Sequence, residues 1–135
     1  NEWVRDASGQ RFDKLSLEAI FGVLFAPVAW LIGENGGEIL NVGQLAGIKI
    51  FATEFIAYDK LASMKKAGLS DHSVFLSTFA LCGFANFMSI GIQIGGIGAL
   101  APERRSDLAA LGVKALIGGT LASLLSACIA GMFYS

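Results

Sequence analysis

Residues 47–58, GIKIFATEFIAY, decide the fold because they place Lys49 and Glu54 inside an otherwise apolar segment. A spanning helix needs about 20 apolar residues, and a run of about 10–14 favours a buried helix or a re-entrant segment. The uncharged run before Lys49, Ile39–Ile48, falls in the shorter class. We therefore predict a re-entrant helical hairpin over residues 37–66, with its two half-helices joined near Gly47–Lys49. Non-helical backbone at membrane depth needs surrounding protein or a water-filled cavity, so the hairpin implies a site or a pathway.

The composition around this segment favours a membrane protein. Of the 135 residues, 54% are hydrophobic and 16% are charged, against roughly 45–50% and about 25% in soluble domains. High hydrophobicity excludes a disordered chain. A net charge of −1 argues against a nucleic-acid partner, which requires a basic footprint. The first residue is Asn1, not Met, so we expect a processed chain or a piece of a longer one.

The uncharged runs on either side of the hairpin predict membrane-spanning helices. Residues 73–100 and 115–135 carry no Asp, Glu, Lys or Arg, and a shorter apolar run covers residues 19–33. We predict an all-α integral membrane fold. Its parts in chain order are an amphipathic segment (1–14), a transmembrane helix (15–33), the hairpin (37–66), a discontinuous transmembrane helix (72–100) and a last transmembrane helix (107–134). Basic residues near the span ends favour a cytoplasmic loop at Pro102–Arg105.

Glu54 is an ionisable residue at membrane depth, which by default marks a functional site. One interpretation is a carboxylate aimed at a polar ligand. The other is a structural partner for Lys49 in a buried ion pair, since buried charges need partners. The spacing leaves both open.

A second polar group lies in the middle of the uncharged run 73–100. Asn86, Ser89 and Gln93 are spaced i, i+3 and i+7, so they share one helix face. They either hydrogen-bond a ligand or join neighbouring helices, a common use of such side chains in membranes. Glycines around them predict a helix break near Gly83–Ser89, which would expose backbone groups to a ligand. For Gly91 and Gly95 we favour close helix packing.

The remaining motifs indicate packing rather than chemistry. The last span carries two rows of small residues, 118/122/126/130 and 119/123/127/131, which allow close helix approach. Cys82 and Cys128 lie inside predicted spans, and we expect buried free thiols. One His and two distant Cys do not form a zinc site, and no nucleophile–base set is evident. We therefore expect a protein that is not an enzyme.

Two long motifs resemble those of the concentrative nucleoside transporters. Residues 47–58 are similar to the family's G-x-K-x-x-x-N-E-F-V-A-Y motif, and residues 82–91, CGFANFMSIG, are similar to its C-G-F-A-N-F-x-S-I-G motif. The likeness continues through 25–30, 94–107 and 112–131, and covers about residues 15–133. One departure is Thr53, where the family usually has Asn, so the contacts of that amide are in question.

The resemblance implies the C-terminal part of a homotrimeric symporter that moves nucleosides inward with a cation gradient. By motif position, Glu54, Asn86 and Ser89 would hold the ribose hydroxyls, and Phe84 would lie against the nucleoside. The coupling cation, Na⁺ or H⁺, would bind outside this segment, and no cofactor is implied. The implied partners are a nucleoside, the lipid bilayer, the rest of the transporter and two further copies, in the inner membrane of a bacterium.

Two other classes of function compete with this interpretation. The chain would be a structural or assembly module of a membrane complex if its intramembrane polar residues served only as interhelical glue. A membrane-embedded enzyme ranks lowest, because it would need a metal or nucleophile constellation.

Overall fold

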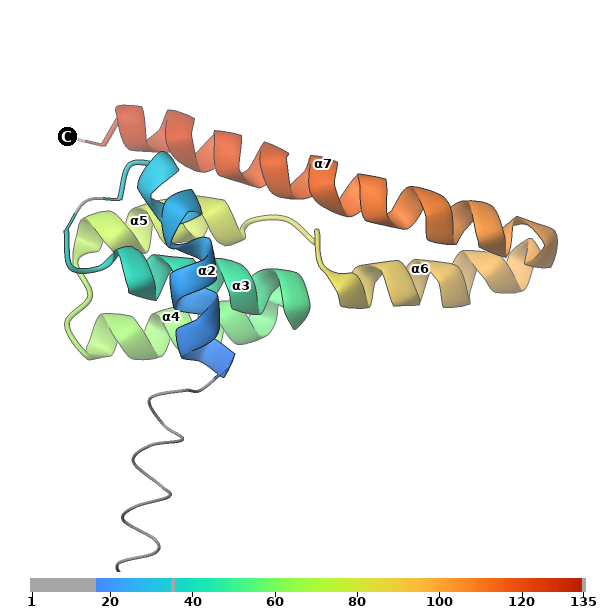
Figure 1. The fold of residues 1–135 in the computed structure, drawn as a ribbon, viewed down its shortest axis with the longest axis horizontal. Coiled ribbons are helices and arrows are strands. Elements are labelled where there is room, and N and C mark those ends of the chain that lie inside the picture. Colours follow the sequence, from blue (N-terminus) through green and yellow to red (C-terminus); the bar gives the residue numbers. More distant parts are fainter. Residues whose placement is uncertain (1–16, 35, 135) are drawn as a thin grey trace, which may run out of the picture.

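The computed structural model describes residues 17–34 and 36–134, so the predicted amphipathic segment at 1–14 lies outside the described residues. All the regular elements in the described part are helices (Figure 1). In chain order they are α2 (Leu17–Leu31), α3 (Ile39–Phe51), α4 (Glu54–Lys66), α5 (Asp71–Leu81), α6 (Phe87–Leu100), the 3₁₀ turn η1 (Pro102–Arg104) and α7 (Arg105–Met132).

The helices form two regions (Figure 1). Helices α2–α5 pack together as a unit that we name the bundle. Helix α6 continues in the direction of α5 but projects away from the bundle, and the first half of α7 runs back beside it; we name this pair the arm. The 28 residues of α7 span about 42 Å at 1.5 Å per residue. This length lets α7 pack on α6 at one end and on α5 at the other.

Glycines bring α2 and α3 into backbone contact. A Cβ added at Gly43 would lie 2.7 Å from the carbonyl oxygen of Gly22 and 3.0 Å from the Ala26 nitrogen. Neither backbone atom can move without moving its helix, so a larger residue at position 43 would separate the two helices. Glu18 of α2 stabilises one edge of the contact between α2 and α3. Its Oε2 accepts hydrogen bonds of 2.8 Å from Gln44 Nε2 and Lys60 Nζ.

The chain reverses at Ala52–Thr53, between α3 and α4, and the predicted join near Gly47–Lys49 is wrong. Helix α3 continues through Gly47 and ends at Phe51. Gly47 allows close packing on α2, since an added Cβ would lie 2.5 Å from Phe21 Cβ. Thr53 has extended backbone (φ −144, ψ 159), and its hydroxyl accepts a hydrogen bond from Ile56 N at 3.3 Å. This is the N-cap arrangement that starts a helix.

The helical run 71–100 is interrupted at residues 82–86, so the break expected near Gly83–Ser89 is present and starts one residue earlier. Gly83 has φ +117, a conformation that side chains other than glycine rarely adopt. Ser123 of α7 supports the break: its Oγ lies 2.8 Å from the Cys82 oxygen and 3.0 Å from the Gly119 oxygen. Its hydroxyl therefore satisfies a carbonyl that the interruption leaves without a helical partner.

Cys82 and Cys128 are free thiols, as expected, but their predicted burial is wrong. Cys82 is exposed and Cys128 is half-buried. The helix ends at Leu81, so Cys82 belongs to the interrupted segment instead of a packed helix face.

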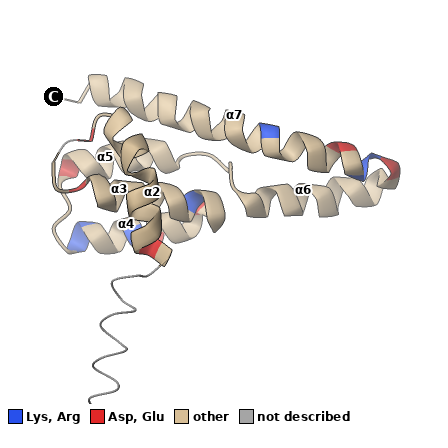
Figure 2. Ribbon diagram, in the orientation of Figure 1, with Lys and Arg blue, Asp and Glu red and all other residues tan. Residues whose placement is uncertain are grey.

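Burial differs sharply between the two regions. The bundle contains the main apolar core: Phe21, Leu45, Ile48, Ala57, Leu61, Leu69 and Leu81. Helix α6 buries only Gly98 and exposes large apolar side chains: Phe87, Met88, Ile92, Ile97 and Leu100. Figure 2 shows that α6 carries no charge. By length and composition, one helical stretch in the described residues, Pro102–Met132, suits a membrane crossing.

Candidate functional site

The two helix breaks meet, so that the N-termini of α4 and α6 lie together (Figure 1). Glu54 is the first residue of α4 and Asn86 is the N-cap of α6. Asn86 Nδ2 donates a 2.5 Å hydrogen bond to Glu54 Oε2. Glu54 is 6% exposed and Asn86 is 2% exposed. A carboxylate and an amide from residues 32 apart therefore share one buried location.

Ser89 joins the same group through Asn86. Asn86 Oδ1 accepts hydrogen bonds from the Ser89 backbone N at 2.8 Å and from Ser89 Oγ at 2.9 Å. The first of these is the capping bond that begins α6. Glu54, Asn86 and Ser89, which we name the polar cluster, are thus brought together as the sequence predicts.

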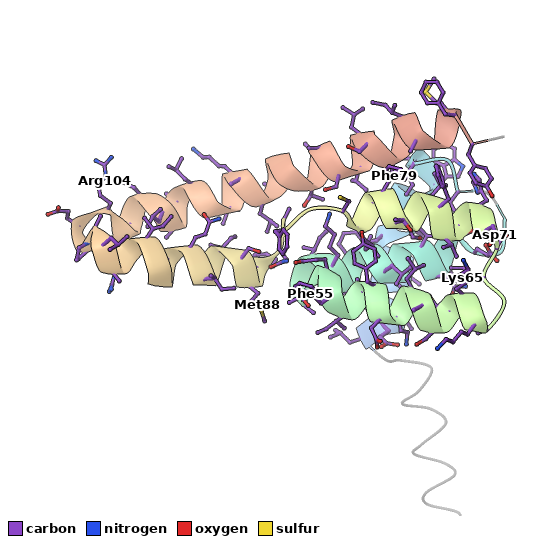
Figure 3. The ribbon with its side chains drawn as sticks, turned by 180° about the vertical axis from the view of Figure 1, so that it is seen from behind. Phe55, Lys65, Asp71, Phe79, Met88 and Arg104 are labelled. Carbon is purple, nitrogen blue, oxygen red and sulfur yellow. The ribbon has the colours of Figure 1, made fainter. Side chains whose placement is uncertain are left out.

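Phe84, the fourth predicted site residue, lies at the edge of this cluster. Its ring is exposed and meets Phe55 edge-on, with ring centroids 6.2 Å apart. Figure 3 shows Phe55 at the start of α4, facing the start of α6 where Met88 lies. The two aromatic rings form an apolar wall beside the polar cluster.

Lys49 does not pair with Glu54 in the described part of the chain. Its Nζ donates a 2.9 Å hydrogen bond to the carbonyl oxygen of Ala80, in the last turn of α5. A cation is favourable there, because helix C-termini carry partial negative charge. The ion-pair interpretation of Glu54 is therefore wrong, and the carboxylate takes a neutral amide as its partner.

The electrostatics of the junction follow from helix polarity. The N-termini of α4 and α6 face the polar cluster, and their partial positive charges favour a carboxylate. The C-terminal end of α5 approaches the same junction, where it accepts the hydrogen bond from Lys49. The two helix N-termini therefore favour negative charge at the polar cluster, where Glu54 forms no ion pair within the described residues.

A cavity of about 240 Å³ opens between α6 and α7 beside the polar cluster. Its polar lining comes from Asn86, Ser89 and Gln93, and Phe84, Leu108 and Gly112 supply apolar lining. Gln93 is exposed and lies one turn beyond Ser89. The cavity thus presents amide and hydroxyl groups, which both donate and accept hydrogen bonds.

The donor set suits a neutral, hydroxyl-bearing ligand better than a metal ion. Within residues 17–34 and 36–134, no three His, Cys, Asp or Glu side chains are grouped so that they could hold a metal. The polar cluster instead offers one carboxylate, which is a strong hydrogen-bond acceptor, and an amide and a hydroxyl, which both donate and accept hydrogen bonds.

Sequence reasoning singled out Lys49, Thr53 and Ser123 but missed the supporting role of each. Thr53 uses its hydroxyl to cap α4, and this role explains why a Thr can stand in the motif without an amide. Ser123 was assigned to a packing row, although it also holds the break that positions Asn86. In the sequence, a hydroxyl residue at a predicted helix start indicates a cap, and a hydroxyl residue opposite a predicted break indicates a partner for a free carbonyl.

Comparison with known proteins adds the family context. The family model described as "Na+ dependent nucleoside transporter C-terminus" matches residues 2–131. Sodium/nucleoside cotransporter 1 of Rattus norvegicus is 42% identical over 134 residues, covering 89% of this chain and 21% of that protein. An uncharacterized transporter of Haemophilus influenzae is 49% identical over 127 residues, covering 90% of this chain and 30% of that protein.

The fold also matches solved structures. The structure of CNTnw in an inward-facing substrate-bound state superposes with a TM-score of 0.82 at 44% identity, covering 89% of this chain and 30% of that one. CNTnw N149L in the intermediate 1 state gives a TM-score of 0.85 at 42% identity, covering 98% and 33%. The chain therefore spans about a fifth to a third of the length of the proteins it matches.

Proposed function

The chain belongs to the concentrative nucleoside transporter family, of which it is a C-terminal portion, and from this premise we propose that it supplies the ribose-binding half of the nucleoside site in a cation-coupled symporter. The observation that carries the proposal is the buried contact between Glu54 of α4 and Asn86 of α6. Two helix interruptions converge on a carboxylate and an amide beside a cavity, which is the arrangement a polar ligand requires.

The chemistry of the polar cluster fits ribose. Its hydroxyls donate to the Glu54 carboxylate and exchange hydrogen bonds in both directions with Asn86 and Ser89. Hydrogen bonds to charged groups contribute roughly 1.5–3 kcal/mol each. A site built for hydroxyls rejects an analogue that lacks one, because its buried polar groups are then left without partners. Phe84 and Phe55 offer an apolar wall for the rest of the nucleoside.

The proposal includes the arrangement in the membrane. Helix α2 is a scaffold helix, α3 and α4 form a re-entrant hairpin, α5 and α6 form one interrupted span, and α7 is the last span. The name of the rat relative supports nucleoside as the substrate class and sodium as a driving ion. The complete protein is a homotrimer in a bilayer, the inner membrane of a bacterium, and the coupling cation, Na⁺ or H⁺, binds outside this segment.

Nucleoside uptake into proteoliposomes, measured with the full-length transporter, tests this function. We expect Glu54→Gln and Asn86→Ala to lower uptake at least about tenfold, since a tenfold loss corresponds to about 1.4 kcal/mol. Glu54→Gln should also reduce the preference for a ribonucleoside over its 2′-deoxy and 3′-deoxy analogues. Glu103→Gln, on the exposed η1 turn, is the matched control and should leave uptake unchanged.

A thermal-shift measurement on the same variants separates ligand binding from assembly. A ribonucleoside should raise the unfolding temperature of the wild-type protein, because a ligand that binds the folded state stabilises it by mass action. That rise should be absent in Glu54→Gln. Unchanged uptake in both site variants would overturn the proposal. Weakened assembly with the deoxy preference retained would instead support the structural-module alternative.

A further inference from the structure

A second buried carboxylate lies far from the polar cluster, at the opposite end of α5. Glu34, between α2 and α3, is 2% exposed, and its Oε2 accepts no hydrogen bond within the described residues. Burying a carboxylate oxygen without a donor is costly, and such atoms in native proteins call for a specific explanation. Glu34 Oε2 is therefore a buried acceptor without a donor in the described part of the chain.

His72, in the first turn of α5, stands next to this oxygen. Its Nδ1 lies 3.9 Å from Glu34 Oε2, and its side chain is 38% exposed. The separation is too long for a hydrogen bond but is within the range of an ion pair once the imidazole is charged. The ring of Tyr134 packs edge-on against His72, with centroids 5.1 Å apart. The imidazole is thus held beside the buried carboxylate on one side and reaches solvent on the other.

The charges around His72 favour a cation. Glu38, the N-cap of α3, accepts hydrogen bonds from Ser70 N and from the Ser70 and Ser73 hydroxyls. These bonds hold the pKa of Glu38 below its ordinary value, and the charge of His72 lowers it further. Asp71 precedes His72 on α5, and Tyr134 faces His72 from the C-terminal end of the chain. Helix α4 ends in two exposed lysines, Lys65 and Lys66.

Three segments converge at this end of the molecule. Figure 1 shows the α2–α3 connection, the start of α5 and the C-terminal end of α7 together, and Figure 2 shows acidic residues gathered there. Within the described part of the chain, neither Glu34 nor Glu38 forms an ion pair with Lys or Arg. A positive charge placed on His72 would therefore be the cationic partner that this junction lacks.

We propose that Glu34 and His72 form a proton-binding site, in which the imidazole takes up one proton and pairs with the buried carboxylate. The pair joins the α2–α3 connection to α5. The pair is complete when the imidazole carries the proton and is lost when the proton leaves. The ligand is a proton, and the site is separate from the polar cluster.

The unfolding temperature of the full-length protein between pH 8.0 and pH 5.5 tests the proposal. We expect acidification to raise the unfolding temperature of the wild-type protein by about 1 °C or more relative to that of His72→Gln. In a Glu34→Gln background, His72→Gln should have the same effect at both pH values. Asp59→Asn, an exposed change on α4, is the control and should track the wild-type protein.

Nuclear magnetic resonance of ¹³C-labelled histidine provides a readout that does not depend on stability. The His72 signal is identified by its loss in His72→Gln, and its titration midpoint should fall in Glu34→Gln. An unchanged midpoint, or a stability difference independent of pH, would overturn the proposal. Sodium titration at pH 8.0 completes the test: a Glu34-dependent stabilisation by Na⁺ alone would show that a metal cation, not a proton, fills the site.

Discussion

The bundle and the arm differ in how their apolar side chains are packed. In the bundle, apolar side chains such as Leu45 and Leu61 pack against one another. In the arm, Ile92 and Leu100 of α6 are exposed, and Gly91 and Gly95 have no atoms near the position of a Cβ. Apolar composition therefore predicts that a segment avoids water, but it does not say what the segment contacts.

The polar cluster lies where the two regions meet. Glu54 belongs to the bundle, whereas Asn86 and Ser89 start the arm. The packing of the bundle fixes the position of the carboxylate, and the amide depends on the break that Ser123 supports. A substitution in the bundle should therefore affect the position of Glu54, and a substitution at the break should affect the position of Asn86. The following substitutions test the two regions one at a time.

The largest expected difference comes from truncating one leucine in each region. Leu45 is 1% exposed and Leu100 is 89% exposed. Leu45→Ala should lower the free energy of unfolding by about 2–5 kcal/mol, because it removes buried methyl groups and leaves a cavity. Leu100→Ala should change it by less than about 0.5 kcal/mol. The measurement is denaturant or thermal unfolding of the full-length protein. Equal effects of the two substitutions would contradict the difference in burial between the bundle and the arm.

A pair of glycine substitutions tests close packing. Gly43→Ala forces a Cβ to within 2.7 Å of the Gly22 oxygen, and overpacking of this kind costs about 1–3 kcal/mol. Gly95→Ala meets no atom within 4 Å and should be neutral or stabilising, since alanine favours a helix by about 0.5–1 kcal/mol. A lower unfolding temperature for Gly95→Ala would show that a further helix packs on α6 there.

Two serines on α7 test how the arm is joined to the bundle. Ser123→Ala removes the hydroxyl that satisfies the Cys82 oxygen and should cost about 1–2 kcal/mol. Within the described part of the chain, Ser126 bonds only the Ala122 oxygen of its own helix, so Ser126→Ala should have little effect. Ser123→Ala should also weaken ribonucleoside binding, measured by isothermal titration, because it loosens the segment that leads to Asn86. Matching behaviour of the two variants would contradict this role for Ser123.

The smallest expected effect concerns Glu38, which ties α3 to the start of α5. Because hydrogen bonds lower its pKa in the folded protein, its contribution to stability is present above the ordinary carboxyl pKa and is lost as the pH falls through the lowered value. Glu38→Gln should therefore reduce the unfolding temperature at pH 7 and match the wild-type protein in strong acid. A difference that grows on acidification would contradict this sign.

The helical class, the two interruptions and the polar residues at them could be predicted from the sequence. Glu54 and Asn86 stand out because a polar or ionisable residue within an apolar run marks a candidate site. The exact position of the first interruption could not be predicted: Gly47 resembles a helix breaker, yet its role depends on Phe21 of another helix. The partner of Lys49 is also a tertiary contact, with a carbonyl 31 residues away.

Two further features lay beyond sequence reasoning for the same reason. The lack of a donor to Glu34 is visible only once α2, α5 and the C-terminal end are placed together. The division between the bundle and the arm depends on which apolar faces find partners. Interactions between distant segments decide these features, and local propensity does not encode them.

The hydrogen bond from Asn86 to Glu54 means that the site carries its own competitor. A hydroxyl that binds at Oε2 would compete with the amide for that oxygen, so its affinity would reflect an exchange of one partner for another instead of the full strength of a new bond. The same exchange keeps the buried carboxylate bonded whenever it is not holding a ligand. In the proposed site, this exchange would favour reversible capture over tight retention.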